Sequence, residues 1–205
     1  MKGYTKAVES DPGNAYAYYQ LGSMYKDRKA FDKAEYAYER LLNIFPAHPD
    51  ANYDLGYVYR KKGLYDRAIT QYKKTLEVNP ENVHAHYDMG YIYGKNREYK
   101  KALEEYKKVL EIDPEHAYAH YDMGYIYRKN GDYKKALEEY KKVLEIDPEH
   151  VHAHYDMGYI YRKNGEYKKA LEAYKKVLEM DPEHPYAYYD MGLIYEELGM
   201  KKQGR

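Results

Sequence analysis

The chain of 205 residues carries 34 basic and 34 acidic side chains, so its formal net charge at pH 7 is zero. This balance argues against a protein built mainly to grip phosphate backbones, and the absence of cysteine excludes disulfides, thiolate metal sites and cysteine nucleophiles. No apolar run approaches the ~20 residues that cross a bilayer, and no signal-peptide pattern opens the chain. We therefore expect no membrane association and a cytoplasmic location.

Internal repetition organises the chain. Residues 83–116, 117–150 and 151–184 align without gaps, and adjacent copies differ at five places, which fits recent duplication or deliberate design. A fixed period of 34 residues is typical of a solenoid, in which each unit buries its apolar face against its neighbours. The sequence predicts a single array over residues 1–205, made of full units at 15–48, 49–82, 83–116, 117–150 and 151–184 with partial units at 1–14 and 185–205.

Each unit is expected to contain two helices. In the unit 117–150, the first helix runs to about Lys129 and ends at Asn130-Gly131, because glycine supplies a left-handed conformation. The second runs from about Tyr133 to Ile146, where Asp147-Pro148 prevents continuation. Apolar residues at helical spacing predict the core-facing stripes; these are Ala119, Met123, Ile126 and Tyr127 in the first helix, and Ala136, Leu137, Tyr140, Val143 and Leu144 in the second.

The pattern Leu55-Gly56-x-x-Tyr59, followed by Ala68, Tyr72 and Pro80, resembles the tetratricopeptide repeat. The later units repeat it as Met89-Gly90-x-x-Tyr93, Met123-Gly124-x-x-Tyr127 and Met157-Gly158-x-x-Tyr161. The resemblance implies an all-α, right-handed solenoid of antiparallel helix pairs, with the first helices lining a concave surface. One departure recurs: His86, His120 and His154 stand where the family often has tryptophan early in the first helix.

The concave surface is the expected place for function. At about 100° per residue, Tyr121, Tyr125 and Arg128 share one face of their helix, and the same places recur in other units. At the ends of the array, Ser23 and Leu193 replace the second tyrosine. The candidate ligand-binding residues are Tyr53, Tyr57, Arg60, Tyr87, Tyr91, Tyr121, Tyr125, Arg128, Tyr155, Tyr159 and Arg162.

Tyrosine offers rigid contact area with a hydrogen-bonding tip, and arginine beside it can bind carboxylates or stack on rings. The groove therefore predicts a protein-interaction scaffold that binds an extended peptide or a partner helix. Two other interpretations stay open: the tyrosines stack on one another between neighbouring first helices, or the chain is an engineered repeat protein with no cognate ligand.

A clamp for chaperone C-terminal carboxylates, found in part of the family, is not favoured. Such clamps use lysine, asparagine and arginine at places that here hold Tyr53, Tyr57 and Asp88, or their equivalents one unit along. A row of aspartates in the groove would repel a carboxylate; its members are Asp54, Asp88, Asp122, Asp156 and Asp190.

Other classes of function find less support. One aromatic residue per unit with basic neighbours suits single-stranded nucleic acid, but the neutral charge and the aspartate row oppose it. The pairs His116/His120 and His150/His154 have i,i+4 spacing, yet two ligands are too few for a closed metal site. With no phosphate-cradling glycine loop, no serine beside a histidine and an acid, and no isolated carboxylate pair, we expect neither catalysis nor a cofactor.

Two local features carry further expectations. In the third unit, Gly94 and Arg97 exchange the arginine and glycine of the later units, which predicts a weaker helix end. The chain also begins and ends at the same place of the repeat, so residues 1–11 match a second helix and residues 185–198 a first helix. Copies could therefore stack head to tail; the alternative is a piece of a longer array with frayed ends.

Overall fold

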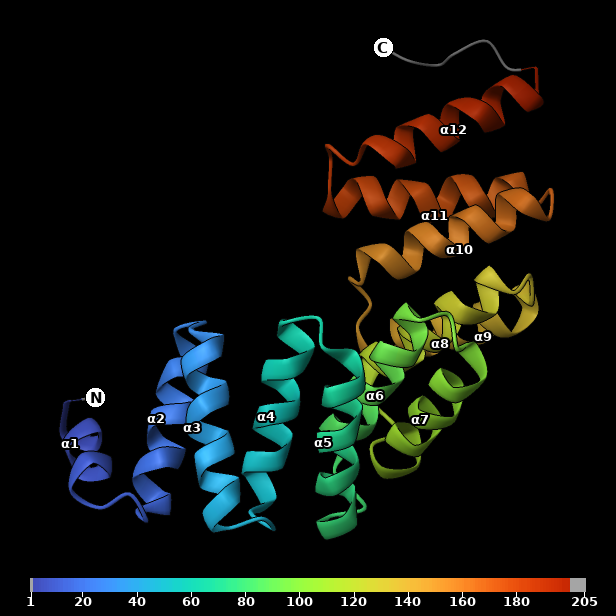
Figure 1. Ribbon diagram of the computed structural model, residues 1–205. Helices are drawn as coiled ribbons and strands as arrows, with labels where there is room; N and C mark the ends of the chain where they lie inside the picture. The colour runs from blue at the N-terminus through green and yellow to red at the C-terminus, as the bar shows by residue number, and fades with distance from the viewer. Residues whose placement is uncertain (1, 200–205) are drawn as a thin grey trace. The chain divides into compact units, whose positions relative to one another are not determined.

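The computed structural model describes residues 2–199, which form twelve α-helices and no strand. Met1 and residues 200–205 lie outside the described part, and so does the prediction for the last residues of the final partial unit. The chain divides into two compact units, Met1–Ile112 and Asp113–Arg205, each a stack of helices (Figure 1). The predicted fold class, an all-α solenoid of antiparallel helix pairs, is confirmed.

Each helix packs mainly against its neighbours in the sequence. In the first unit α2 packs against α3, α4 against α5 and α6 against α7, and in the second α8 packs against α9 and α10 against α11. The helices of the first unit are α1 (Lys2–Ser10), α2 (Ala15–Asp27), α3 (Phe31–Ile44), α4 (Pro49–Lys61), α5 (Tyr65–Val78), α6 (Val83–Lys95) and α7 (Tyr99–Ile112). Those of the second are α8 (Ala117–Lys129), α9 (Tyr133–Ile146), α10 (Val151–Lys163), α11 (Tyr167–Met180) and α12 (Pro185–Glu197).

The helix boundaries follow from local chemistry. At the start of α6, the Asn82 side chain accepts a hydrogen bond from the Ala85 amide at 2.9 Å, which satisfies a donor that the helix leaves unpaired. At the end of α8, Gly131 adopts a φ of 79°, and the amide of Asp132 then bonds back to the Tyr127 carbonyl. The predicted bounds of both helices in the unit 117–150 agree with the structure.

A tyrosine–glycine contact sets how closely the two helices of a pair approach. A Cβ atom added at Gly90 would lie 2.7 Å from the Tyr106 ring, so only glycine lets the ring of α7 lie flat on α6. The same contact recurs in the pairs Gly22–Tyr38, Gly56–Tyr72, Gly124–Tyr140 and Gly158–Tyr174.

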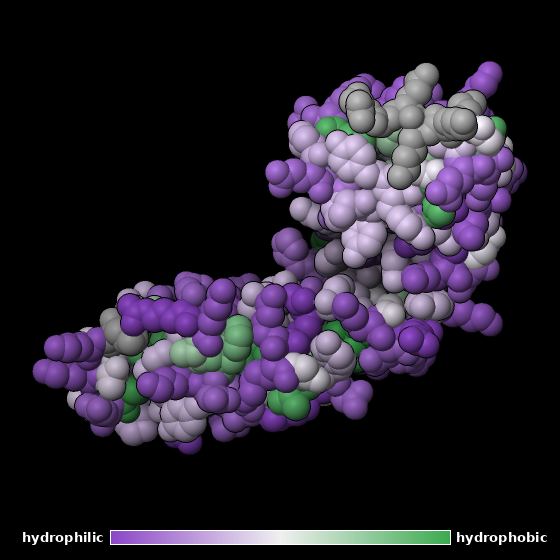
Figure 2. All heavy atoms as spheres, turned by 90° about the horizontal axis from the view of Figure 1, so that it is seen from above, coloured by the Kyte–Doolittle hydropathy of each residue, from purple (hydrophilic) through white to green (hydrophobic). Residues whose placement is uncertain are grey.

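The core lies between the helices and the charged residues lie outside it. In the unit 117–150, six of the predicted core residues are buried, whereas Leu137, Leu144 and Tyr127 are half-buried and pack against the core cluster. The buried residues are Ala119, Met123, Ile126, Ala136, Tyr140 and Val143. Hydrophilic side chains cover most of the face seen in Figure 2, with apolar groups in small separate patches.

The turn after α6 has the strain that its sequence predicts. Arg97 adopts a φ of 61°, in the left-handed region that Gly131 and Gly165 occupy in the later units. A side chain there costs on the order of 1 kcal/mol, and Gly94 inside α6 costs about 1 kcal/mol relative to alanine. The added Cβ at position 94 would meet nothing nearer than the Tyr106 hydroxyl at 4.0 Å, so the helix has room for a side chain.

We therefore predict that the double change Gly94→Arg with Arg97→Gly raises the melting temperature by roughly 4–8 °C. Thermal unfolding followed by circular dichroism measures the change. Arg97→Ala is the control, because alanine also pays for a positive φ and should give no comparable gain. An unchanged or lower melting temperature for the double variant would contradict the assignment of strain to this turn.

Candidate functional site

Four aspartates of the first helices lie in the protein interior, which corrects the expectation that they line the groove; these are Asp54, Asp88, Asp156 and Asp190, whereas Asp122 is half-buried. Asp88 is 5 % exposed, and its Oδ2 accepts hydrogen bonds from the Tyr72 hydroxyl at 2.8 Å and the Tyr53 hydroxyl at 3.3 Å. One of these rings comes from the second helix of the preceding pair and the other from its first helix. Each such carboxylate therefore ties two helices to the next one along the chain.

The second unit repeats this arrangement. Asp156 accepts from the hydroxyls of Tyr121 and Tyr140, each at 3.1 Å. Asp190 accepts from Tyr155 at 2.8 Å and Tyr174 at 3.3 Å. Burial raises the pKa of Asp88 and of Asp156, and the arginine beside each of them opposes that rise.

The arginines among the candidate residues, Arg60, Arg128 and Arg162, form ion pairs with these aspartates. The Arg60 Nε atom lies 3.4 Å from Asp88 Oδ1, and the Arg162 Nη2 atom lies 3.1 Å from Asp190 Oδ1. Arg128 makes the same pair with Asp156 at 3.4 Å, and in the first unit Lys26 pairs with Asp54. Because these cations neutralise buried carboxylates, they are not free to clamp a ligand carboxylate, as the sequence interpretation assumed.

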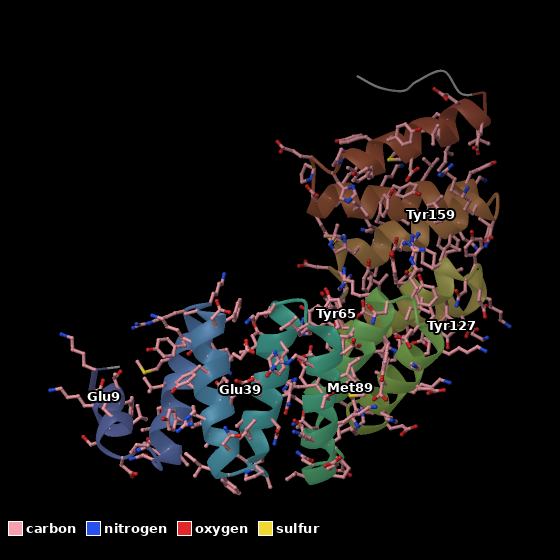
Figure 3. All side chains as sticks on the ribbon, viewed as in Figure 1. Glu9, Glu39, Tyr65, Met89, Tyr127 and Tyr159 are labelled. Atoms are coloured by element: carbon pink, nitrogen blue, oxygen red, sulfur yellow. The ribbon has the colours of Figure 1, made fainter. Side chains whose placement is uncertain are left out.

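The predicted tyrosines form two columns along the first helices, and the second column lies beside the same arginines. The first column consists of Tyr53, Tyr87, Tyr121 and Tyr155, and the second of Tyr57, Tyr91, Tyr125 and Tyr159. The Arg60 guanidinium lies 5.2 Å from the centroid of the Tyr57 ring and 5.3 Å from that of Tyr91. Arg128 lies 5.2 Å from the rings of both Tyr125 and Tyr159, the latter labelled on α10 in Figure 3. Each guanidinium is therefore held between two rings, an attractive arrangement for a planar cation.

The two tyrosine columns thus have different roles. In the first column, the hydroxyls of Tyr53, Tyr121 and Tyr155 donate hydrogen bonds to buried aspartates. Burial raises the pKa of each of these tyrosines. The second column keeps ring surface in solvent: Tyr125 is 37 % exposed, and the other three members are half-buried. These three hydroxyls of the first column are therefore engaged in the interior, whereas the rings of the second column remain partly accessible.

A row of lysines beside the second column escaped the sequence analysis. These residues are exposed, and their ammonium groups lie 5.3–5.6 Å from the tyrosine rings four positions earlier. The sequence does contain a signal for them, because a lysine directly follows each of positions 60, 94, 128 and 162. In the outer repeats the same place holds Asp27 and Glu197. The row consists of Lys61 and Lys95 in the first unit and Lys129 and Lys163 in the second.

The histidines have structural partners. His86 Nδ1 lies 2.6 Å from Glu105 Oε2 and its Nε2 lies 2.9 Å from the Pro80 carbonyl, and His120 has equivalent partners. Both ring nitrogens of each histidine therefore have a partner within the protein. In the next unit Ala173 replaces the glutamate, and His154 keeps its bond to the Pro148 carbonyl. Within residues 2–199, no three histidine or carboxylate side chains gather as metal ligands would.

None of the described helices combines the length and apolar character that a bilayer crossing requires.

Two family models of the same kind of repeat together match nearly all of the described residues. The model described as "TPR repeat" matches residues 56–96, 98–131, 124–165 and 158–199, and the model described as "Tetratricopeptide repeat" matches residues 4–36 and 37–70. A search of curated proteins gives no match.

Solved structures of similar proteins share the fold. YrrB, described as "a TPR protein with an unusual peptide-binding site", has 27 % sequence identity and a TM-score of 0.76 over 91 % of this chain and 96 % of its own. A structure of MamA has 27 % identity and a TM-score of 0.75 over 80 % and 95 % of the two chains. MamA from Desulfovibrio magneticus RS-1 has 26 % identity and a TM-score of 0.77 over 83 % and 97 %.

His150, which begins α10, gives the stability a pH dependence. His150 Nδ1 accepts from the Ala153 amide at 3.1 Å, which requires that nitrogen to be unprotonated. Burial lowers the pKa of His150, with Asp147 opposing and His152 adding to the effect. A histidine whose folded pKa lies below its unfolded value of about 6.5 contributes stability above that pH and loses it as the pH falls.

We predict that His150→Asn keeps the cap, as Asn82 does in α6, and reduces the loss of stability between pH 7.5 and pH 5.5. The difference should be on the order of 1 kcal/mol, the value of a helix cap. Melting temperatures of both proteins across this range provide the measurement. The reciprocal change Asn82→His should increase the loss, and equal losses in all three proteins would refute the role of the cap.

Proposed function

We propose that this chain, which belongs to the tetratricopeptide repeat family, is a non-catalytic scaffold that binds an extended segment of a partner protein on its first helices. The observation that carries the proposal is the pairing of half-exposed tyrosine rings with free lysines on α4, α6, α8 and α10. Rigid rings with polar tips and flexible cations are the groups that recognise extended peptides. The peptide-binding site named for YrrB supports the same function here.

The charge of this surface favours an acidic segment. Four aspartates of the first helices are buried and paired with arginine or lysine, so they contribute little repulsion; these are Asp54, Asp88, Asp156 and Asp190. The lysines that remain in solvent carry one positive charge per repeat, at the spacing of successive first helices. Within either unit, a peptide with carboxylates along its length would meet two of them at once, and such steering raises association rates.

The proposal predicts a specific loss of binding when the lysine row is neutralised. The variant carries glutamine at all four positions of the row, Lys61, Lys95, Lys129 and Lys163. Fluorescence anisotropy then measures how tightly it binds a labelled glutamate-rich peptide. At about 0.3–0.5 kcal/mol for each exposed charge, the Kd should rise about tenfold. An array of peptides of varied sequence, screened with the unchanged protein, identifies further peptides whose Kd for the two proteins can be compared in the same way.

A matched control has the same change in net charge on the second helices. Lys73, Lys107, Lys141 and Lys175 are exposed on α5, α7, α9 and α11, and their change to glutamine should alter the Kd less than about twofold. Equal losses in both quadruple variants would exclude the lysine row as the binding surface. Tighter binding of a single-stranded nucleic acid than of any peptide would instead favour the nucleic-acid alternative.

End-to-end association of copies is a second candidate, and the surroundings of Gly192 favour it. Among the described residues, nothing lies within 4 Å of a Cβ added at Gly192, whereas the equivalent glycines of the earlier first helices each carry a tyrosine ring. Tyr4 of α1 stands at the repeat position of those tyrosines. A ring from a second copy would complete this contact, and repetition of the contact would extend the array.

This association predicts a mass that grows with concentration in light scattering. Gly192→Leu would fill the open face of α12 with a side chain and should keep the protein monomeric. A constant monomeric mass for the unchanged protein, from micromolar to millimolar concentration, would refute the association.

A further inference from the structure

The first junction of the array lacks one ring. In the junctions α4–α6 and α8–α10, the cation of the first helix lies between two tyrosine rings. At the junction α2–α4, Ser23 occupies the repeat position of Tyr57, and Lys26 occupies that of Arg60. Serine supplies no aromatic surface, so Tyr57 faces α2 without a partner ring at that position.

A cavity lies at this junction. It has a volume of about 550 Å³, within the range of about 300–1,000 Å³ that is typical of ligand pockets. Its aromatic wall is formed by Phe31, Tyr53 and Tyr57, and its amino groups come from Lys26, Lys29 and Lys61.

The cavity corresponds to the space of the missing ring. Tyr57 lies beside Arg60 and Lys61, its neighbours three and four residues later. A ring at position 23 would by the same helical geometry lie over Lys26 and Asp27, and both residues line the cavity. The space is therefore bounded by groups that pack against an aromatic ring in the other repeats.

We propose that this cavity is the anchor site for an aromatic side chain of the bound peptide, flanked by acidic residues. The ring would lie against Tyr57 and beside the ammonium groups of Lys26 and Lys61, combining ring–ring with cation–ring attraction. The proposal rests on the peptide-binding function and adds the position and identity of one peptide residue.

The charges around the cavity select the residues next to the ring. Asp54 is buried and accepts from the Tyr38 hydroxyl at 2.9 Å while it pairs with Lys26, so its charge is compensated. Lys29 and Lys61 are exposed, and Asp27 is the exposed acid that opposes them. The surplus of positive charge favours glutamate or aspartate beside the aromatic residue over lysine or arginine.

The test uses the protein's own repeat residue to fill the cavity. Two labelled, capped pentapeptides are compared: one has a central phenylalanine flanked by glutamates, and the other has alanine in its place. The unchanged protein should bind the phenylalanine peptide about tenfold more tightly, the worth of a ring contact and its burial. Ser23→Tyr should remove this preference and leave the weaker affinity for the alanine peptide intact.

Ser23→Ala is the matched control, because it leaves the cavity open and should keep the tenfold preference. Ser23→Leu fills the same space with an aliphatic side chain and serves if the tyrosine variant loses helical content by circular dichroism. A preference that survives both filling substitutions would overturn the anchor site.

The outcomes separate this inference from the function on which it rests. Equal binding of the two peptides by the unchanged protein would refute the aromatic anchor while the scaffold function stands. Binding of neither peptide, together with an unresponsive peptide array, would refute both.

Discussion

The structure depends on a buried carboxylate placed where three helices meet. Asp88 and Asp156 each accept two tyrosine hydroxyls and pair with one arginine, so a charge that would be costly alone is surrounded by donors. The donors come from both helices of the preceding pair, which fixes the position of the next first helix relative to them. The tyrosine-rich composition follows from this need, because tyrosine fills apolar space and still brings a hydrogen-bond donor to the carboxylate.

The same contact decides what the concave surface can offer a ligand. Arginine pairs with aspartate, and the tyrosines of the first column donate to the same carboxylates, so the proposed recognition would fall to groups that the junction does not use. These are the outer ring faces of the second column and the lysines beside them. The exposed lysines therefore stand beside aspartates of which four are buried.

The helices and their pairing could be predicted from the sequence, because glycine, proline and apolar spacing act over a few residues. The helix 133–146 and the strained turn at Arg97 are examples. The burial of the aspartates could not be predicted, since an aspartate at a groove-facing angle reads as exposed unless its distant donors are known. The pairing of Arg60, Arg128 and Arg162 with buried aspartates could not be predicted for the same reason, and the binding role of the tyrosines stays a prediction.

The range of the junction contacts has a consequence for how such a chain can change in length. Asp88 takes its hydrogen bonds from tyrosines 16 and 35 residues earlier, and Asp156 takes its own from the same two separations. Every donor therefore lies within little more than one period of its acceptor. Gain or loss of a whole 34-residue copy by unequal recombination restores each of these contacts with an equivalent partner, whereas an insertion of a single residue inside a copy breaks them. Copy number can drift in such a gene while the interior chemistry stays constant.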